Sequence, residues 1–209
     1  MKVQITFVEE LLGTASANPE IHREFIASKA PNATGIEEEV ASIGIEGSIE
    51  KAMTIFPKES GNPFLWDYQI KGFFKDACSM LSRAGDAGKD ENGRKIKGTA
   101  NESCKLTAYK KIIDGLIFVL PRKIPLVLPA GENLSNCERP LRGQTAQGER
   151  IALANSETAP EGTKIQIEIR CLDIRHEKAV REWLDYGVLR GIGQWRNSGK
   201  GRFNWKEIK

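Results

Sequence analysis

A stretch near the C-terminus, residues 187–205, combines glycines, basic residues and aromatic residues. It reads GVLRGIGQWRNSGKGRFNW and lies between Asp185 and Glu207 without an acidic residue of its own. Glycines let a backbone approach a ligand closely and present its N–H groups. Arginine adds a planar fork that matches phosphate, and aromatic rings offer faces on which nucleobases stack. The stretch therefore predicts contact with a phosphate-bearing ligand, most simply a nucleic acid.

The candidate ligand contacts in this stretch are the following residues: Arg190, Gly191, Gly193, Trp195, Arg196, Ser198, Gly199, Lys200, Gly201 and Arg202. The glycine spacing matches neither the Walker loop nor the dinucleotide-binding fingerprint, so it does not specify a nucleotide cofactor. Trp195, Phe203 and Trp205 alternate roughly as in a strand, so a core role for these aromatic residues is an equal alternative.

Two further places carry residues suited to nucleic acid. Arg139, Arg142 and Arg150 surround the polar segment 143–148, which lacks large apolar residues and is predicted to be a loop with phosphate contacts, through Arg142 in particular. Trp66 and Tyr68 could stack on bases, or they could belong to the core.

Composition indicates a single domain over residues 1–209, long enough to bury a substantial core. The formal net charge of +3 is too small to indicate a nucleic-acid binder. Its distribution is more informative, because basic residues concentrate after Arg190 while acidic residues concentrate in 37–50. This asymmetry predicts one polyanion-facing side.

Other features narrow the class of protein. The four cysteines form no C-x-x-C pair, so we expect neither a zinc site nor another metal or cofactor. The N-terminus alternates between polar and apolar residues, unlike a signal peptide, and no segment has the ~20 apolar residues of a membrane span. We therefore expect a cytoplasmic protein with reduced thiols.

The elements that must position these residues follow from periodicity. Alternation predicts strands at 3–7, 115–120, 123–128, 150–154 and 164–170, with a short final strand near Phe203. Apolar spacing and capping signals predict helices at 18–28, 34–56, 68–81, 106–113 and 176–186. The polar segment 84–103 is expected to be a mobile insertion. Together these elements predict an α+β domain with a mostly antiparallel sheet under helices.

Three segments together resemble a known family. Residues 191–203 resemble the C-terminal glycine-rich loop of the RAMP superfamily, the ferredoxin-like or RRM-like RNA-binding proteins of CRISPR effector complexes. Residues 64–74, with Lys71 before a glycine, and the early Leu-Leu-Gly-Thr at 11–14 also look like segments of those proteins. The resemblance implies single-stranded RNA held by the loop, with Lys71 approaching the same groove, in a homo-oligomer or a complex with CRISPR-like subunits.

The resemblance also has departures. RAMP proteins that cut RNA are expected to carry an acidic residue after the first strand, and residues 13–18 have none. His22 is a weak catalytic candidate, since related guide-processing proteins use a histidine in that neighbourhood. The leading hypothesis is therefore a non-enzymatic RNA-binding protein.

The whole chain also resembles uncharacterised phage and prophage proteins, which would place its role in or against CRISPR-type antiviral defence, in the cytoplasm of a bacterial host cell. One alternative is a sponge for a nucleotide second messenger of anti-phage defence, and another is an RNA endonuclease that uses His22.

Overall fold

The computed structural model describes residues 1–17, 53–84, 91, 101–145 and 148–208, with the side chains of 141–153 left out of the description. Two predicted elements, the helix at 18–28 and most of the helix at 34–56, lie outside the described residues. Within the described part, no helix is long and apolar enough to cross a membrane.

The central sheet has four strands in the order β12-β1-β11-β7, with every neighbouring pair antiparallel. They are β1 (Lys2–Phe7), β7 (Ile117–Leu120), β11 (Lys164–Cys171) and β12 (Phe203–Ile208). Helix α3 (Asp67–Ala84) lies between β1 and β7 in the chain, and α6 (Glu177–Arg190) lies between β11 and β12. Taken together, these six elements follow the β-α-β-β-α-β order of ferredoxin-like domains. The expected α+β class with a ferredoxin-like antiparallel sheet is confirmed.

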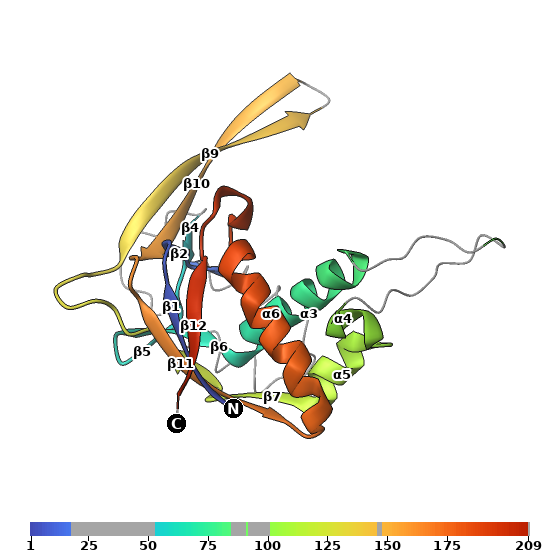
Figure 1. The fold of residues 1–209 in the computed structure, drawn as a ribbon. Coiled ribbons are helices and arrows are strands. Elements are labelled where there is room, and N and C mark those ends of the chain that lie inside the picture. The colour runs from blue at the N-terminus through green and yellow to red at the C-terminus, as the bar shows by residue number, and fades with distance from the viewer. Residues whose placement is uncertain (18–52, 85–90, 92–100, 146–147, 209) are drawn as a thin grey trace, which may run out of the picture.

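One face of this sheet and the two helices enclose the core (Figure 1). Alternate residues of β1, Val3, Ile5 and Phe7, are buried, and β11 alternates in the same way. Phe74 of α3 packs against Trp183 of α6 with ring centroids 5.4 Å apart. The buried faces of these strands, on which every second residue is apolar, thus pack against the apolar stripe of α3, as the sequence patterns predict.

A long hairpin forms the largest part of a second sheet. Its strands, β9 (Ser135–Thr145) and β10 (Gly148–Ala159), pair along their whole length, and the far end extends away from the rest of the molecule (Figure 1). The near end of β10 pairs with β2 (Leu11–Leu12) and with β4 (Met53–Ile55), which in turn pairs with β3 (Ala15–Ser16).

The remaining elements are short. Strands β5 (Lys58–Glu59), β6 (Asn62–Trp66) and β8 (Lys123–Pro125) form a third sheet. Helices α4 (Glu102–Lys105) and α5 (Tyr109–Leu116) pack beside α3. Single 3-10 turns, η1 (Ile174–His176) and η2 (Arg196–Ser198), stand before α6 and within the glycine-rich segment.

Several element predictions need correction. Residues 143–145 and 148, which were predicted to lie in a loop, belong to β9 and β10, because the ladder supplies backbone hydrogen bonds whatever the polarity of the side chains. The end of the predicted helix 34–56 is strand β4, which pairs parallel to β10. The strands predicted at 115–120 and 123–128 are shorter, β7 and β8, and they belong to different sheets, with β7 paired to β11 and β8 paired to β6.

Smaller differences concern boundaries. The helix predicted at 106–113 begins at Tyr109 and runs to Leu116. Segment 84–103 begins with the last residue of α3 and ends within α4, and the rest of it apart from residues 91 and 101 lies outside the described residues. The mobility expected for this insertion stays a prediction.

Candidate nucleic-acid interface

The glycine-rich segment forms a closed loop over residues 191–202, between the end of α6 and the start of β12. Ile192 donates its backbone N–H to the carbonyl of Gly201 at 3.0 Å, and the N–H of Gly201 reaches the carbonyl of Glu10 at 2.8 Å. Gly201 has a φ of +71°, and a Cβ there would lie 1.9 Å from the carbonyl oxygen of Ile192. Only glycine satisfies both conditions. We name residues 191–202 the glycine loop.

The outer end of the glycine loop is a tight turn that carries Trp195 outward. Trp195 has a φ of 55°, which is unusual for a residue with a side chain, and η2 follows it directly. Backbone strain of this kind persists only where the surrounding structure enforces it. The indole is 40% exposed, so Trp195 is not a core residue, whereas Phe203 is fully buried on β12.

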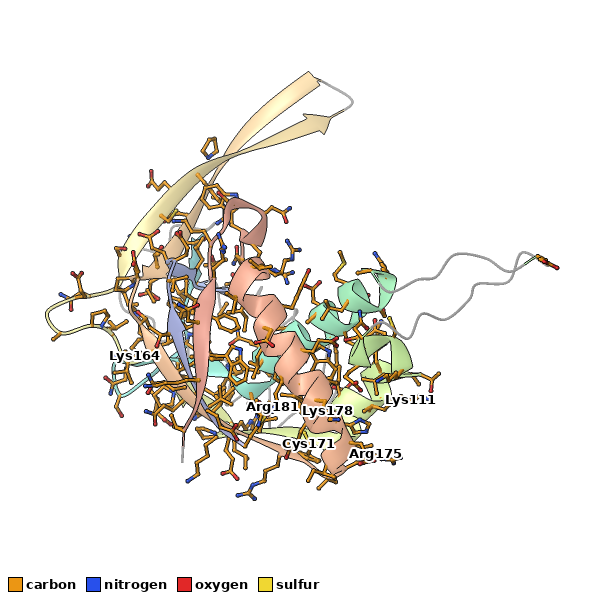
Figure 2. The ribbon with its side chains drawn as sticks, in the orientation of Figure 1. Lys111, Lys164, Cys171, Arg175, Lys178 and Arg181 are labelled. Carbon is orange, nitrogen blue, oxygen red and sulfur yellow. The ribbon has the colours of Figure 1, made fainter. Side chains whose placement is uncertain are left out.

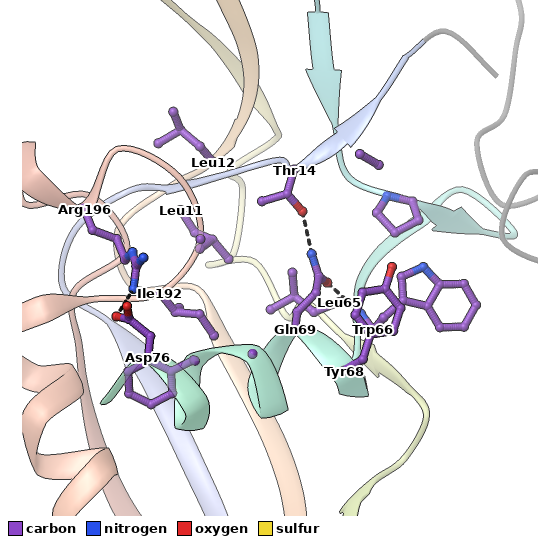
Figure 3. A pocket seen from close by; sticks show the side chains of 15 residues that line it. Leu11, Leu12, Thr14, Leu65, Trp66, Tyr68, Gln69, Asp76, Ile192 and Arg196 are labelled. Atoms are coloured by element: carbon purple, nitrogen blue, oxygen red, sulfur yellow. Dashed lines mark hydrogen bonds and ion pairs between the residues drawn. The ribbon is translucent and has the colours of Figure 1, made fainter. Parts of the chain in front are cut away.

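The glycine loop, the turn after β1 and the beginning of α3 surround a pocket of about 330 Å³ (Figure 3). Leu11, Leu12, Phe73 and Ile192 contribute apolar side chains to its wall. Polar groups stand among them: Gln69 donates to the hydroxyl of Thr14, and its own carbonyl oxygen accepts from the backbone N–H of Trp66 at 2.8 Å. A mostly apolar cavity of this size with a few fixed polar groups is typical of a small-ligand or nucleobase site.

The cations of the glycine loop already have partners within the protein. Arg196 forms an ion pair with Asp76 of α3 at the pocket wall (Figure 3), and Lys200 Nζ lies 2.7 Å from Glu10 Oε2. The hydrogen bond from Lys200 to Glu10 raises the pKa of Lys200. Arg190 donates to Asn197 Oδ1 at 2.7 Å and lies 3.8 Å from Asp76.

Arg202, the fourth of these cations, donates from Nε to the carbonyl of Val188 at 3.3 Å. The bond of Lys200 braces the loop against the turn after β1, and that of Arg196 braces it against α3. A phosphate would have to compete with carboxylates for Arg196 and Lys200.

Lys71 does not join this group. Its ammonium donates to the backbone carbonyl of Asp114 at 3.3 Å and lies 4.9 Å from the ring centroid of Phe118. Both partners belong to the α5–β7 side of α3, whereas Gln69, Phe73 and Asp76 face the pocket. Helical periodicity thus turns Lys71 to another face of α3 than the residues that line the pocket, and its contact with RNA stays a prediction.

The base of the hairpin reaches the glycine loop through Arg139 of β9. Its Nη2 donates to Gln194 Oε1 at 2.9 Å, and its guanidinium lies 5.0 Å from the ring centroid of Trp195. Gln194 in turn donates from Nε2 to the carbonyl of Gly13 at 2.8 Å and to Thr54 Oγ1 at 3.2 Å. Gln194 was not a sequence candidate, because a single glutamine carries no signal of non-local bonds.

The other sequence candidates have mixed outcomes. Trp66 is 2% exposed, with its ring against Phe64, so its proposed role in stacking on a base is wrong. Tyr68 is exposed at the pocket rim. Arg142 pairs with Ile151 in the hairpin, and its side chain lies outside the description. His22 lies outside the described residues. Ser198 is exposed at the outer end of the glycine loop.

No protein-family model and no curated protein sequence matches the chain. Among solved structures, a chain in "Cryo-EM structure of the Type III-B Cmr-beta bound to cognate target RNA" aligns with all of this chain at a TM-score of 0.50 and 11% identity. This chain spans 58% of the length of that one. At such identity the likeness concerns the fold, and it supports the RAMP-like fold that the sequence resemblance implied.

Two other solved structures align at TM-scores below 0.5. A chain of a "Type IV-B CRISPR Complex" aligns at 0.46 with 13% identity, over 98% of this chain and 88% of that chain. Cmr6 from Pyrococcus furiosus aligns at 0.49 with 11% identity, over 99% of this chain and 97% of that chain.

Proposed function

We propose that this protein is a non-enzymatic, RAMP-like binding protein that holds single-stranded RNA over the glycine loop and the adjoining pocket. The observation that carries the proposal is the meeting of three segments distant in the sequence: the turn after β1, the beginning of α3 and the glycine loop. These are the three segments that resemble the RAMP superfamily. Their meeting puts the Arg196 guanidinium beside a mostly apolar cavity.

An unpaired strand fits this site better than a duplex. The pocket of about 330 Å³ has Leu11, Phe73 and Ile192 on its apolar wall, against which one unstacked base can pack. Tyr68 at its rim offers an exposed ring. Stacking of a base on an aromatic side chain is worth about 1–3 kcal/mol, and it requires a strand whose bases can leave the stack.

Phosphates would contact the basic side of the glycine loop. Arg196 lines the pocket, Arg190 ends α6 just before the loop, and Lys200 lies in a separate hollow beside Glu10. Each would exchange an internal bond for a phosphate. Such an exchange yields less free energy than neutralising an unpaired cation. Binding through the loop should therefore be moderate and should weaken as salt rises.

The proposed setting is a CRISPR-type assembly, as a subunit or as a mimic of one. Support comes from the fold likeness to a chain of a Cmr complex bound to cognate target RNA. A phage origin, assembly of several copies and a role in defence or counter-defence belong to the same proposal.

The first experiment is to purify the protein, record its absorbance ratio at 260 and 280 nm, and identify what denaturation releases by mass spectrometry. Heterogeneous RNA is the expected result. A single small nucleotide would favour the sponge, and cleaved RNA would favour an endonuclease. A protein that carries no RNA and binds no labelled single-stranded RNA at low salt would overturn the proposal.

A variant test locates the binding. Arg196→Ala combined with Arg202→Ala should flatten the salt dependence of RNA affinity, by about 0.7 in the log–log slope for each phosphate that the loop no longer neutralises. Circular dichroism and thermal melting serve as the control for folding. Unchanged RNA binding and an unchanged salt slope in the folded variant would show that the glycine loop is not the binding surface.

A further inference from the structure

Within the part of the chain that the structure describes, Arg139 is a buried cation with no anion beside it. Its side chain is 7% exposed, and its Nε and Nη1 are buried without a hydrogen-bond acceptor among the described residues. Its neighbours in the described ranges are the amide oxygen of Gln194 and the ring of Trp195, both uncharged. Arg196 and Lys200, by contrast, both face carboxylates.

Such an arrangement is unfavourable for the protein alone. A buried charge costs several kcal/mol unless it is paired, and each buried donor without an acceptor adds a desolvation penalty. Stability gives no reason to keep a guanidinium at this position, since an apolar side chain of similar length would fill it at less cost. An anionic ligand that accepts from Nε or Nη1 would supply the missing partner.

Trp195 covers this guanidinium from the outer end of the glycine loop. Its ring lies against Arg139 on one side while the side chain stays 40% exposed. Its backbone is held at a φ of 55° in a turn between Gly193 and Gly199, both at positive φ. Gln194 links Arg139 and the neighbouring Trp195 to Gly13 and Thr54. These contacts join the hairpin base to the segments around the pocket.

We propose that Arg139 is a phosphate-binding residue for RNA and that Trp195 covers it until RNA binds. On binding, the indole leaves the guanidinium and stacks on a nucleobase, and the phosphate takes the donors that become accessible. The proposal rests on the proposed function and extends the RNA path from the pocket to the base of the hairpin. Arginine suits this role because its planar group both stacks on aromatic rings and donates to phosphate oxygens.

The test is Arg139→Met, measured by thermal melting and by polarisation of a labelled single-stranded RNA of mixed sequence over a range of salt. We expect an unchanged or higher melting temperature together with an affinity loss of about tenfold or more. The slope of log affinity against log salt concentration should become shallower by about 0.7, which is the contribution of one phosphate contact on a single strand. Arg139→Lys keeps the positive charge but lacks the planar guanidinium. It should have the salt slope of the wild type and an affinity between those of the wild type and Arg139→Met.

The matched control is Arg175→Met, which removes the same charge from an exposed arginine paired with Asp173. Arg175 lies at the opposite end of α6 from the glycine loop (Figure 2). Its RNA affinity should stay within about twofold of the wild type, since surface substitutions have small effects. An equal loss in both variants would mean that net charge alone drives binding and would overturn the proposal.

Three outcomes separate the hypotheses. Wild-type protein that binds no RNA would overturn both the proposed function and this inference. Wild-type binding with Arg139→Met at equal affinity would overturn this inference alone. A lowered melting temperature in Arg139→Met would assign Arg139 a structural role and overturn it as well.

The movement of Trp195 has its own readout. RNA should change the intrinsic tryptophan fluorescence of the wild type and leave that of Trp195→Phe nearly unchanged. The reason is that Trp66 and Trp183 are buried, while the indole of Trp205 donates to Asp185. An identical fluorescence change in both proteins would overturn the role of Trp195 as the cover.

Discussion

The glycine loop and the base of the β9–β10 hairpin both bring cations to one site, but the two regions differ in how those cations are paired. In the glycine loop, Arg196 and Lys200 each face a carboxylate of the protein. At the hairpin base, Arg139 is more deeply buried and, among the residues that the structure describes, contacts only neutral groups. The region with more positive charge in the sequence therefore has its cations paired with carboxylates, whereas Arg139 has no carboxylate partner among the described residues.

The comparison separates two uses of a basic residue. The ion pairs of the glycine loop fix its position against α3 and the turn after β1, so its arginine and lysine side chains have a structural role before any ligand arrives. A phosphate bound there replaces an existing partner, whereas at Arg139 it would supply a missing one. The same residue types thus differ in what a ligand gains from them, because burial and pairing set the free energy of each interaction.

The largest effect is expected where the glycine loop closes. Gly201→Ala would set a Cβ 1.9 Å from the carbonyl of Ile192 and force an unfavourable φ, so we expect the free energy of unfolding to fall by about 3 kcal/mol or more, with loss of RNA binding. Gly199→Ala is the matched control, since its nearest neighbour would be 3.8 Å away on a flexible side chain and only the positive φ remains, at about 1 kcal/mol. Denaturant unfolding measures both. Equal losses would show that the loop closure is not tightly packed.

A smaller effect of opposite sign is expected from Asp76→Asn. The change keeps the shape of the side chain but removes the carboxylate that occupies Arg196 and lies near Arg190. We expect RNA affinity at low salt to rise by about two- to fivefold, with a stability loss below about 1 kcal/mol. The measurement is a binding titration at several salt concentrations.

Glu10→Gln tests Lys200 in the same way, because it removes the carboxylate with which the Lys200 ammonium forms an ion pair. A rise in affinity for both variants would confirm that internal carboxylates compete with phosphate for the glycine loop. A fall in both would mean that the ion pairs are needed to hold the loop in its binding conformation, and the contrast with Arg139 would then lose its basis.

The smallest effect concerns the core side of α3 and should leave both basic regions untouched. Burial raises the pKa of the Cys78 thiol to about 11, from an ordinary value of 9.0. Between these values the unfolded chain has lost a proton that the folded chain keeps, so the free energy of unfolding should decrease as the pH rises through this window. Cys78→Ala should reduce that decrease without changing RNA affinity, as denaturant titrations at pH values across the window would measure. The same pH slope in the variant would contradict the assignment to Cys78.

Local patterns in the sequence were sufficient for the framework. The alternation in β1 and β11 and the apolar stripe of α3 predicted their structure, because one buried face imposes a period of 2 on a strand and 3.6 on a helix. The predicted α+β class followed from the order of these elements. The glycine loop was also recognisable, since its glycines, cations and aromatic residues are consecutive in the chain.

Patterns failed where a structure depends on a distant partner. Strand β4 was mistaken for the end of a helix because its three residues are fixed by pairing with β10, about a hundred positions away. The polar end of the hairpin lacks the apolar alternation that indicates a strand. It is a strand because its backbone pairs β9 with β10. The predicted position of Lys71 relied on its place in the chain, while its face of α3 points to α5 and β7.

The sequence by itself thus determined the composition of the site: a glycine-rich loop with arginines, a lysine and a tryptophan. Only the tertiary structure decided which cations are paired. Asp76 and Glu10 are far from the glycine loop in the chain, as is Arg139, and no local rule relates them. The physical reason is that helix and strand periodicity arise from neighbouring residues, whereas the burial and pairing of a charge are properties of the folded surface.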